Sequence, residues 1–124
     1  MAPDISPEEM QEYRRTARRW LQEEQHETAA RRERAWMLAR RAALLLKEEF
    51  AVSRVTVFGS LIQEGRFNRW SDLDLAAWGL TSANWLRAIG AVRGLSDEVE
   101  LNLVDVETCS PGLLAVIERE GVDL

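Results

Sequence analysis

Cysteine and histidine are almost absent from this chain of 124 residues, which has only Cys109 and His26. A lone cysteine excludes a disulfide within the chain and fits a reducing compartment. One His and one Cys cannot supply the ligands of a zinc cluster. No apolar run approaches the roughly 18 residues that cross a bilayer, so no membrane contact is expected. The first residues, MAPDISPEEMQEYRR, are acidic and polar, unlike a signal peptide, and a cytoplasmic protein is expected.

Charge is unevenly distributed. Residues 1–50 carry ten basic and ten acidic side chains, whereas residues 51–124 carry six basic and eleven acidic ones. An acidic C-terminal part repels the nucleic-acid backbone, so broad nucleic-acid binding is not expected. It suits a site that requires a metal ion or a basic protein partner, although acidic surface also serves solubility alone.

The segment from Glu8 to Phe50 contains neither glycine nor proline, and Ser6-Pro7 before it is typical of a helix start. Apolar residues recur at helical spacing in its first part and again after residue 34, but residues 22–34 are almost wholly polar. An unbroken helix over 7–49 would be about 60 Å long. We therefore expect either a bend within 22–34 or a first half that projects from the domain.

The apolar residues in the first part of this helix are Met10, Tyr13, Ala17, Trp20 and Leu21. Of these, Met10, Tyr13, Ala17 and Trp20 need a partner. That partner is a second copy of the chain, giving a homo-oligomer, another protein, or a folded-back position on the same domain. We accordingly divide the chain into an N-terminal helical extension, residues 1–34, and a domain, residues 35–124.

The rest of the chain alternates between strand and helix patterns. Strands are predicted at residues 54–58, 72–78 and 98–106, and helices from Ser60 to Gly65, over 83–92 and from 111 to 120. Three strands interleaved with helices predict an α/β (α+β) domain, a small sheet with helices packed against it.

Between residues 55 and 77 the sequence reads VTVFGSLIQEGRFNRWSDLDLAA. Alternate side chains of a strand share one face, so Asp72 and Asp74 point the same way. Two adjacent carboxylates repel each other unless a cation lies between them, and Mg²⁺ prefers carboxylates together with substrate phosphates. Gly59 allows a ligand to approach the backbone, and Ser60 begins a helix whose free N–H groups favour phosphate. The pattern predicts a metal–nucleotide site.

Gly59-Ser60, eleven residues and then Asp72-x-Asp74 resemble the signature of the DNA polymerase β-type nucleotidyltransferase superfamily. The similarity is strongest to its minimal branch, the small MNT proteins encoded beside HEPN-domain partners, and it covers roughly residues 35–124. The resemblance implies a mixed sheet of the nucleotidyltransferase type, with Mg²⁺ bound by Asp72 and Asp74 and the phosphates of ATP held at Gly59 and Ser60.

The third strand departs from the pattern of the family. It reads Leu-Asn-Leu-Val-Asp from Leu101 to Asp105, and the resemblance places the family's third acid at Asn102. An amide can coordinate a metal through its oxygen, but it carries no charge and is a poor proton acceptor. Glu100 shares the strand face of Asn102 and is a weak substitute, whereas Asp105 points to the other face.

Weaker candidates lie in the loop before Asp72. Arg66 and Arg69 are placed to touch phosphate or an acceptor, although loop arginines are more often simply solvated. Trp70 is a candidate for stacking on a base, although a loop Trp more often covers the edge of a core.

The resemblance implies an antitoxin that transfers AMP from Mg-ATP to a hydroxyl, that of a tyrosine, on a HEPN-type ribonuclease toxin. Two alternatives stay open. Asn102 and the long helix favour a catalytically impaired antitoxin that acts by binding alone. A transferase acting on small molecules is the other alternative, although such enzymes usually carry an additional domain that binds the acceptor.

Overall fold

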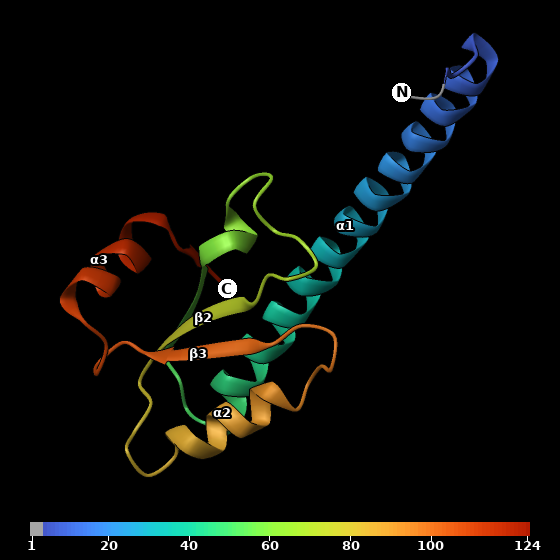
Figure 1. Ribbon diagram of the computed structural model, residues 1–124. Helices are drawn as coiled ribbons and strands as arrows, with labels where there is room; N and C mark the ends of the chain where they lie inside the picture. Colours follow the sequence, from blue (N-terminus) through green and yellow to red (C-terminus); the bar gives the residue numbers. More distant parts are fainter. Residues whose placement is uncertain (1–3) are drawn as a thin grey trace.

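The computed structural model describes residues 4–124, so the first three residues of the expected extension lie outside the described part of the chain. The elements follow in the order α1 (Pro7–Glu49), β1 (Arg54–Phe58), the 3₁₀ turn η1 (Gly59–Ile62), β2 (Leu73–Trp78), α2 (Trp85–Arg93), β3 (Leu101–Asp105), α3 (Pro111–Glu120) and β4 (Val122–Asp123) (Figure 1). No helix within residues 4–124 is long and apolar enough to cross a membrane.

The sheet is mixed, as the resemblance predicted, and its strand order is β3-β2-β1-β4. β1 runs antiparallel to both β2 and β4, whereas β2 and β3 are parallel. The fourth strand was not predicted, because two residues are too few to show a period. It follows Gly121 directly and closes the sheet beside β1.

The two faces of the sheet are covered differently. Alternate residues such as Val55, Val57 and Leu75 are fully buried beneath α1 and α2. The opposite face packs a smaller cluster against α3, in which Ile117 contacts Phe58 and its neighbours. This smaller cluster covers only part of its face. The even-numbered residues at the N-terminal end of β2 lie on this second face, outside the cluster.

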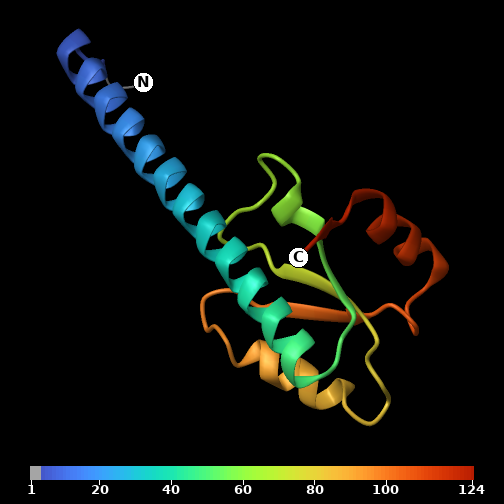
Figure 2. The same cartoon turned by 180° about the vertical axis from the view of Figure 1, so that it is seen from behind.

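α1 is one continuous helix of 43 residues, about 64 Å long at 1.5 Å per residue. Its fully buried residues begin only at Ala35, and Figures 1 and 2 show its N-terminal half projecting from the domain. The bend considered for residues 22–34 is therefore absent, and the projecting alternative is correct. The helix continues without interruption across residues 34 and 35, where the boundary between the extension and the domain was expected.

A group of arginines ties α1 to the domain just before its buried part. Arg34 Nη2 lies 2.6 Å from Glu98 Oε1, and its Nε is 3.0 Å from both carboxylate oxygens. Arg31 donates to the Glu98 carbonyl at 3.1 Å, and Arg32 donates to the carbonyl of Leu61 at 3.3 Å. The bidentate contact of Arg34 lowers the pKa of Glu98.

Three elements have a predicted boundary that is wrong by two residues or more, each because of a local hydrogen bond or turn. The predicted helix from Ser60 to Gly65 is a single 3₁₀ turn that ends at Ile62. The next helix begins at Trp85, not Ala83, because the side chain of Asn84 accepts from the N–H of Thr81 and shapes a preceding turn. Residues 98–100 are not in the third strand, since Ser96 Oγ accepts from the N–H groups of residues 98 and 99.

Candidate functional site

The structure brings Asp72, Asp74 and Asn102 together at the N-terminal ends of β2 and β3. Because the two strands are parallel and in register, Asn102 lies directly beside Asp74. Its side-chain nitrogen Nδ2 is 3.2 Å from Asp74 Oδ1 and 3.3 Å from Asp72 Oδ2. The amide therefore donates to both carboxylates, and the three side chains form one cluster.

Gly59 closes this cluster on the side of β1. It follows the last residue of β1, Phe58, which pairs with Asp74 across the antiparallel ladder. Its φ is +82°, and a Cβ built on it would lie 2.5 Å from Asp74 Oδ2. Glycine is thus required here twice, for the left-handed backbone and for the close approach of the carboxylate.

Ser60 lies in η1 immediately beyond this contact and is half-buried. The prediction of a helix whose N-terminal N–H groups favour phosphate needs correction, because η1 has only four residues and lacks the dipole of a long helix. What remains at this position is a tight turn beside two carboxylates, with backbone and a hydroxyl close to the surface.

The electrostatics of the cluster disfavour two bare charges. Partial burial raises the pKa of Asp74, and the charge of Asp72 raises it further, while the hydrogen bond from Asn102 opposes both effects. No ion pair among the described residues involves either aspartate. A positively charged ligand would therefore reduce the repulsion between the two carboxylates.

The donor set fits a hard divalent cation. Two carboxylates and the amide oxygen that Asn102 presents when its side chain rotates are the oxygen ligands that Mg²⁺ accepts. In residues 4–124 there is no group of three His, Cys, Asp or Glu side chains placed to hold a metal, because the third position of this cluster is Asn102. Substrate phosphates would have to complete the coordination.

Glu100 and Asp105, the two acids closest to Asn102 in the sequence, have contacts outside the cluster. The Glu100 carboxylate is 60% exposed and lies 3.8 Å from Arg93 of α2. Asp105 sits at the far end of β3, and its carboxylate accepts from the N–H of Glu107. The structure therefore gathers Asn102, but not these acids, against the aspartate pair.

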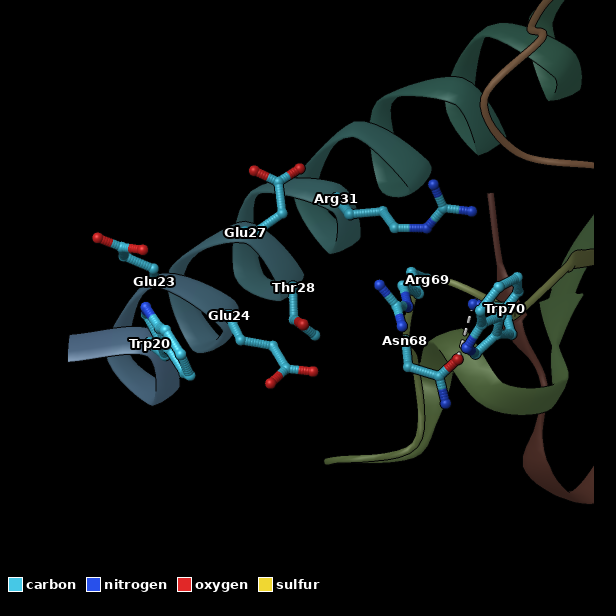
Figure 3. A pocket seen from close by; sticks show the side chains of 9 residues that line it. All are labelled: Trp20, Glu23, Glu24, Glu27, Thr28, Arg31, Asn68, Arg69 and Trp70. Carbon is cyan, nitrogen blue, oxygen red and sulfur yellow. Dashed lines mark hydrogen bonds between the residues drawn. The ribbon is translucent and has the colours of Figure 1, made fainter. Parts of the chain in front are cut away.

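The loop residues Arg69 and Trp70 face α1. The Arg69 guanidinium stacks 4.9 Å from the centroid of the Trp70 ring, which is 79% exposed. Both residues line a cleft of about 930 Å³ between the loop and the side of α1 that carries Trp20, Glu24 and Arg31 (Figure 3). This cleft could not be predicted from the sequence, because its two walls are about 45 residues apart in the chain. Arg66, also exposed, lies in the same loop.

No family model and no curated protein matches the sequence, but solved structures share its fold. A chain in the crystal structure of the toxin–antitoxin MntA-HepT has a TM-score of 0.54 and is 17% identical over 71% of this chain and 69% of its own. Mutant structures of the same pair give TM-scores of 0.51 and 0.52 at 20% and 23% identity, and this chain spans 65% of their length. A candidate minimal nucleotidyltransferase is 31% identical over 77% of this chain and 91% of its own, with a TM-score of 0.49.

The fold and the cluster at its edge define the class: a nucleotidyltransferase-like α/β domain preceded by a long helix. Within that class, the chains of the MntA-HepT structures share the fold that the resemblance to the minimal nucleotidyltransferase (MNT) family predicted.

Proposed function

We propose that this protein is an MNT-type antitoxin that transfers AMP from Mg-ATP to a hydroxyl group of a HEPN-type toxin. The observation that carries the proposal is the close approach of Asp74 to Gly59, which joins the two halves of the motif, Gly59-Ser60 and Asp72-x-Asp74, in one site. The 3₁₀ turn supplies backbone N–H groups and the Ser60 hydroxyl for the phosphates of the nucleotide. Asp72 and Asp74 would hold Mg²⁺, which supplies the positive charge that offsets the triphosphate.

The transfer itself is a displacement at phosphorus. The acceptor oxygen forms a bond to the α-phosphorus of ATP, the bond from that phosphorus to the bridging oxygen breaks, and pyrophosphate leaves. The acceptor loses a proton, which passes to solvent, because the amide of Asn102 is not a base. The contribution of this chain is then to position the reactants and to arrange charge around them.

A toxin as the acceptor is supported by the MntA-HepT neighbours, which are a toxin–antitoxin pair. The acidic balance of residues 51–124 suits a basic protein partner. We propose tyrosine as the modified residue on the resemblance alone, since nothing in the site selects among hydroxyl groups.

A second candidate is an antitoxin that neutralises its toxin by binding only. It is favoured by Asn102, whose amide already donates to both aspartates and so replaces part of the positive charge that a metal ion would bring. Under this alternative the nucleotide site would be a remnant.

Intact-mass analysis tests the proposal. The HEPN-type protein encoded next to this one is incubated with the protein, ATP and Mg²⁺, and we expect a gain of one or more AMP units. The gain should vanish for Asp72→Asn with Asp74→Asn. It should persist for a control with Asp97→Asn and Glu107→Gln, two exposed acids outside the cluster. A stable complex without any gain in mass would favour the binding-only candidate.

A further inference from the structure

The outer edge of β3 carries backbone hydrogen-bonding groups that no strand within residues 4–124 pairs with. β3 is the last strand on its side of the sheet, and its pairing with β2 fixes which groups point outward. Leu73 N–H donates to the carbonyl of Glu100, and Val106 N–H donates to the carbonyl of Ala77. In this parallel ladder the backbone groups of the even-numbered residues of β3 therefore pair with β2. The odd-numbered residues direct their N–H and carbonyl groups away from the sheet, and they are Leu101, Leu103 and Asp105.

This edge is rich in free hydrogen-bond donors and poor in free acceptors. Among the described residues, no acceptor engages the N–H groups of Leu101, Leu103 and Asp105. Two of the outward carbonyls are already used. That of Leu101 accepts from Arg93 Nε at 3.2 Å, and that of Asp105 accepts from two N–H groups of the turn that follows it. Within residues 4–124, only the carbonyl of Leu103 is left to pair with an incoming donor.

β3 has few of the features with which proteins block such an edge. Edge strands are commonly protected by lysine, by proline or by a bulge. The sequence from Leu101 to Asp105 contains neither lysine nor proline, and its register with β2 has no bulge. Its one charged residue lies at its end, and Arg93 covers only its first carbonyl. β4, at the opposite edge, has only two residues, so β3 is the edge that can align an added strand.

We propose that an extended segment of the acceptor protein adds to β3 as a further strand and thereby presents the accepting hydroxyl to the cluster of Asp72, Asp74 and Asn102. This inference rests on the proposed function, which supplies the acceptor. An added strand lies about 4.8 Å from its neighbour, and residues in register share a face. The residue that pairs with Asn102 therefore directs its side chain to the face that carries Asp72 and Asp74, whichever way the segment runs.

The balance of donors and acceptors disfavours a second copy of this chain as the occupant. Two β3 edges side by side would offer many more N–H groups than free carbonyls, and N–H groups that are buried without an acceptor are costly. The main chain of an extended segment from another protein has carbonyls that can accept from Leu101, Leu103 and Asp105. The edge therefore suits a segment that is not itself an edge of this sheet.

Amide hydrogen exchange, resolved by residue with NMR, tests the docking. The full chain is measured alone and with the HEPN-type protein encoded next to it, in both cases without ATP. In the complex the amides of Leu101, Leu103 and Asp105 should exchange more slowly by about tenfold or more. The amides of Asn102 and Val104, which already pair with β2, should be protected in both samples and serve as the internal control.

Three results would overturn the proposal. The first is a neighbouring protein that does not bind, and the second is a complex in which the three odd-numbered amides exchange as fast as before. The third is slow exchange of the Leu103 amide in the protein alone, which would indicate that a second copy already covers the edge. Slower exchange in the complex without AMP transfer would support the docking and refute the proposed transfer, whereas transfer with unchanged exchange would do the reverse.

A pair of variants at one position separates the backbone from the side chain. Leu103→Pro removes an outward donor without breaking the ladder, because the N–H of Leu103 does not pair with β2. Its affinity for the neighbouring protein, measured by calorimetry, should fall about tenfold or more. Leu103→Ala loses the same side chain but keeps the N–H, so it should bind more tightly than Leu103→Pro, and equal affinities would overturn the proposal. If circular dichroism shows that Leu103→Pro does not fold, the exchange measurement on the wild-type protein decides.

Discussion

Replacing Gly59 with alanine perturbs the site at one defined point. The backbone there has φ +82°, and an L-residue in the left-handed region costs about 1–2 kcal/mol. For a domain of this size such a loss lowers the melting temperature by about 4–8 °C. In addition, the new Cβ starts 2.5 Å from Asp74 Oδ2, and ordinary contact begins at 3.4 Å. The carboxylate must therefore move by about 0.9 Å.

This displacement should be visible in function more than in stability. A misplacement of about 1 Å in a catalytic arrangement can cost roughly 100-fold in rate, and we expect a loss of that order in AMP transfer. Mg²⁺-dependent ATP binding, measured by calorimetry, should weaken in the same variant. Thermal unfolding, monitored by circular dichroism, measures the loss of stability in the same variant.

Gly65 provides the matched control. Its φ is +74°, but a Cβ built on it meets nothing within 4 Å. Gly65→Ala should therefore show a similar fall in melting temperature with unchanged ATP binding. The reasoning is refuted if Gly59→Ala and Gly65→Ala bind Mg-ATP equally well, because the contact with Asp74 would then not matter to the site.

Two further predictions concern charge. Asn102→Asp should remove the donor shared by Asp72 and Asp74 and add a third negative charge. The melting temperature of the metal-free variant should therefore fall, Mg²⁺ should stabilise the variant more than the wild type, and any transfer rate should rise. A large loss of transfer would show that the amide is used as it stands. Thr56 lowers the pKa of Asp123 by donating to its carboxylate at 2.6 Å. This hydrogen bond therefore stabilises the folded protein at pH values above the pKa that Asp123 has in the unfolded chain. The stabilisation is lost as the pH falls through the lower pKa that Asp123 has in the folded protein. Thr56→Val should raise the pKa of Asp123 in an NMR titration and shift this loss of stability to higher pH; an unmoved pKa would contradict the assignment.

The fold could be predicted where strong local signals exist. Arg54–Phe58 was predicted to the residue, since an apolar run that ends at glycine has few alternatives, and the start of α1 is set by its Ser-Pro cap, where Ser6 Oγ accepts from Glu9 N. The two-residue β4 has no such signal. Its place depends on Gly121, where a side chain would collide with the carbonyl of Ile117 one turn earlier and with Thr56, which is remote in sequence.

The candidate site was foreseeable as a list of residues but not as a geometry. The spacing of Asp72 and Asp74 predicts a shared face, whereas the bond from Asn102 to both depends on the parallel register of β2 and β3. Glu100 matches the same period, yet it precedes the strand and its carboxylate lies near Arg93. The alternation of residues along a sequence does not show at which residue the strand begins, so it could not exclude Glu100 from β3.

The position of β3 at the edge of the sheet gives the two flanks of the cluster different surroundings. Asn102 belongs to the outermost strand, so one flank of the cluster is bounded by β1 and η1, while no strand formed by residues 4–124 lies beyond the other. A folded protein can bring a side chain to such an open flank without moving any element of the sheet. On that flank Arg93 of α2 donates to the carbonyl of Leu101 at 3.2 Å, so a mobile side chain, and not a strand, is what an incoming molecule would meet beside Asn102.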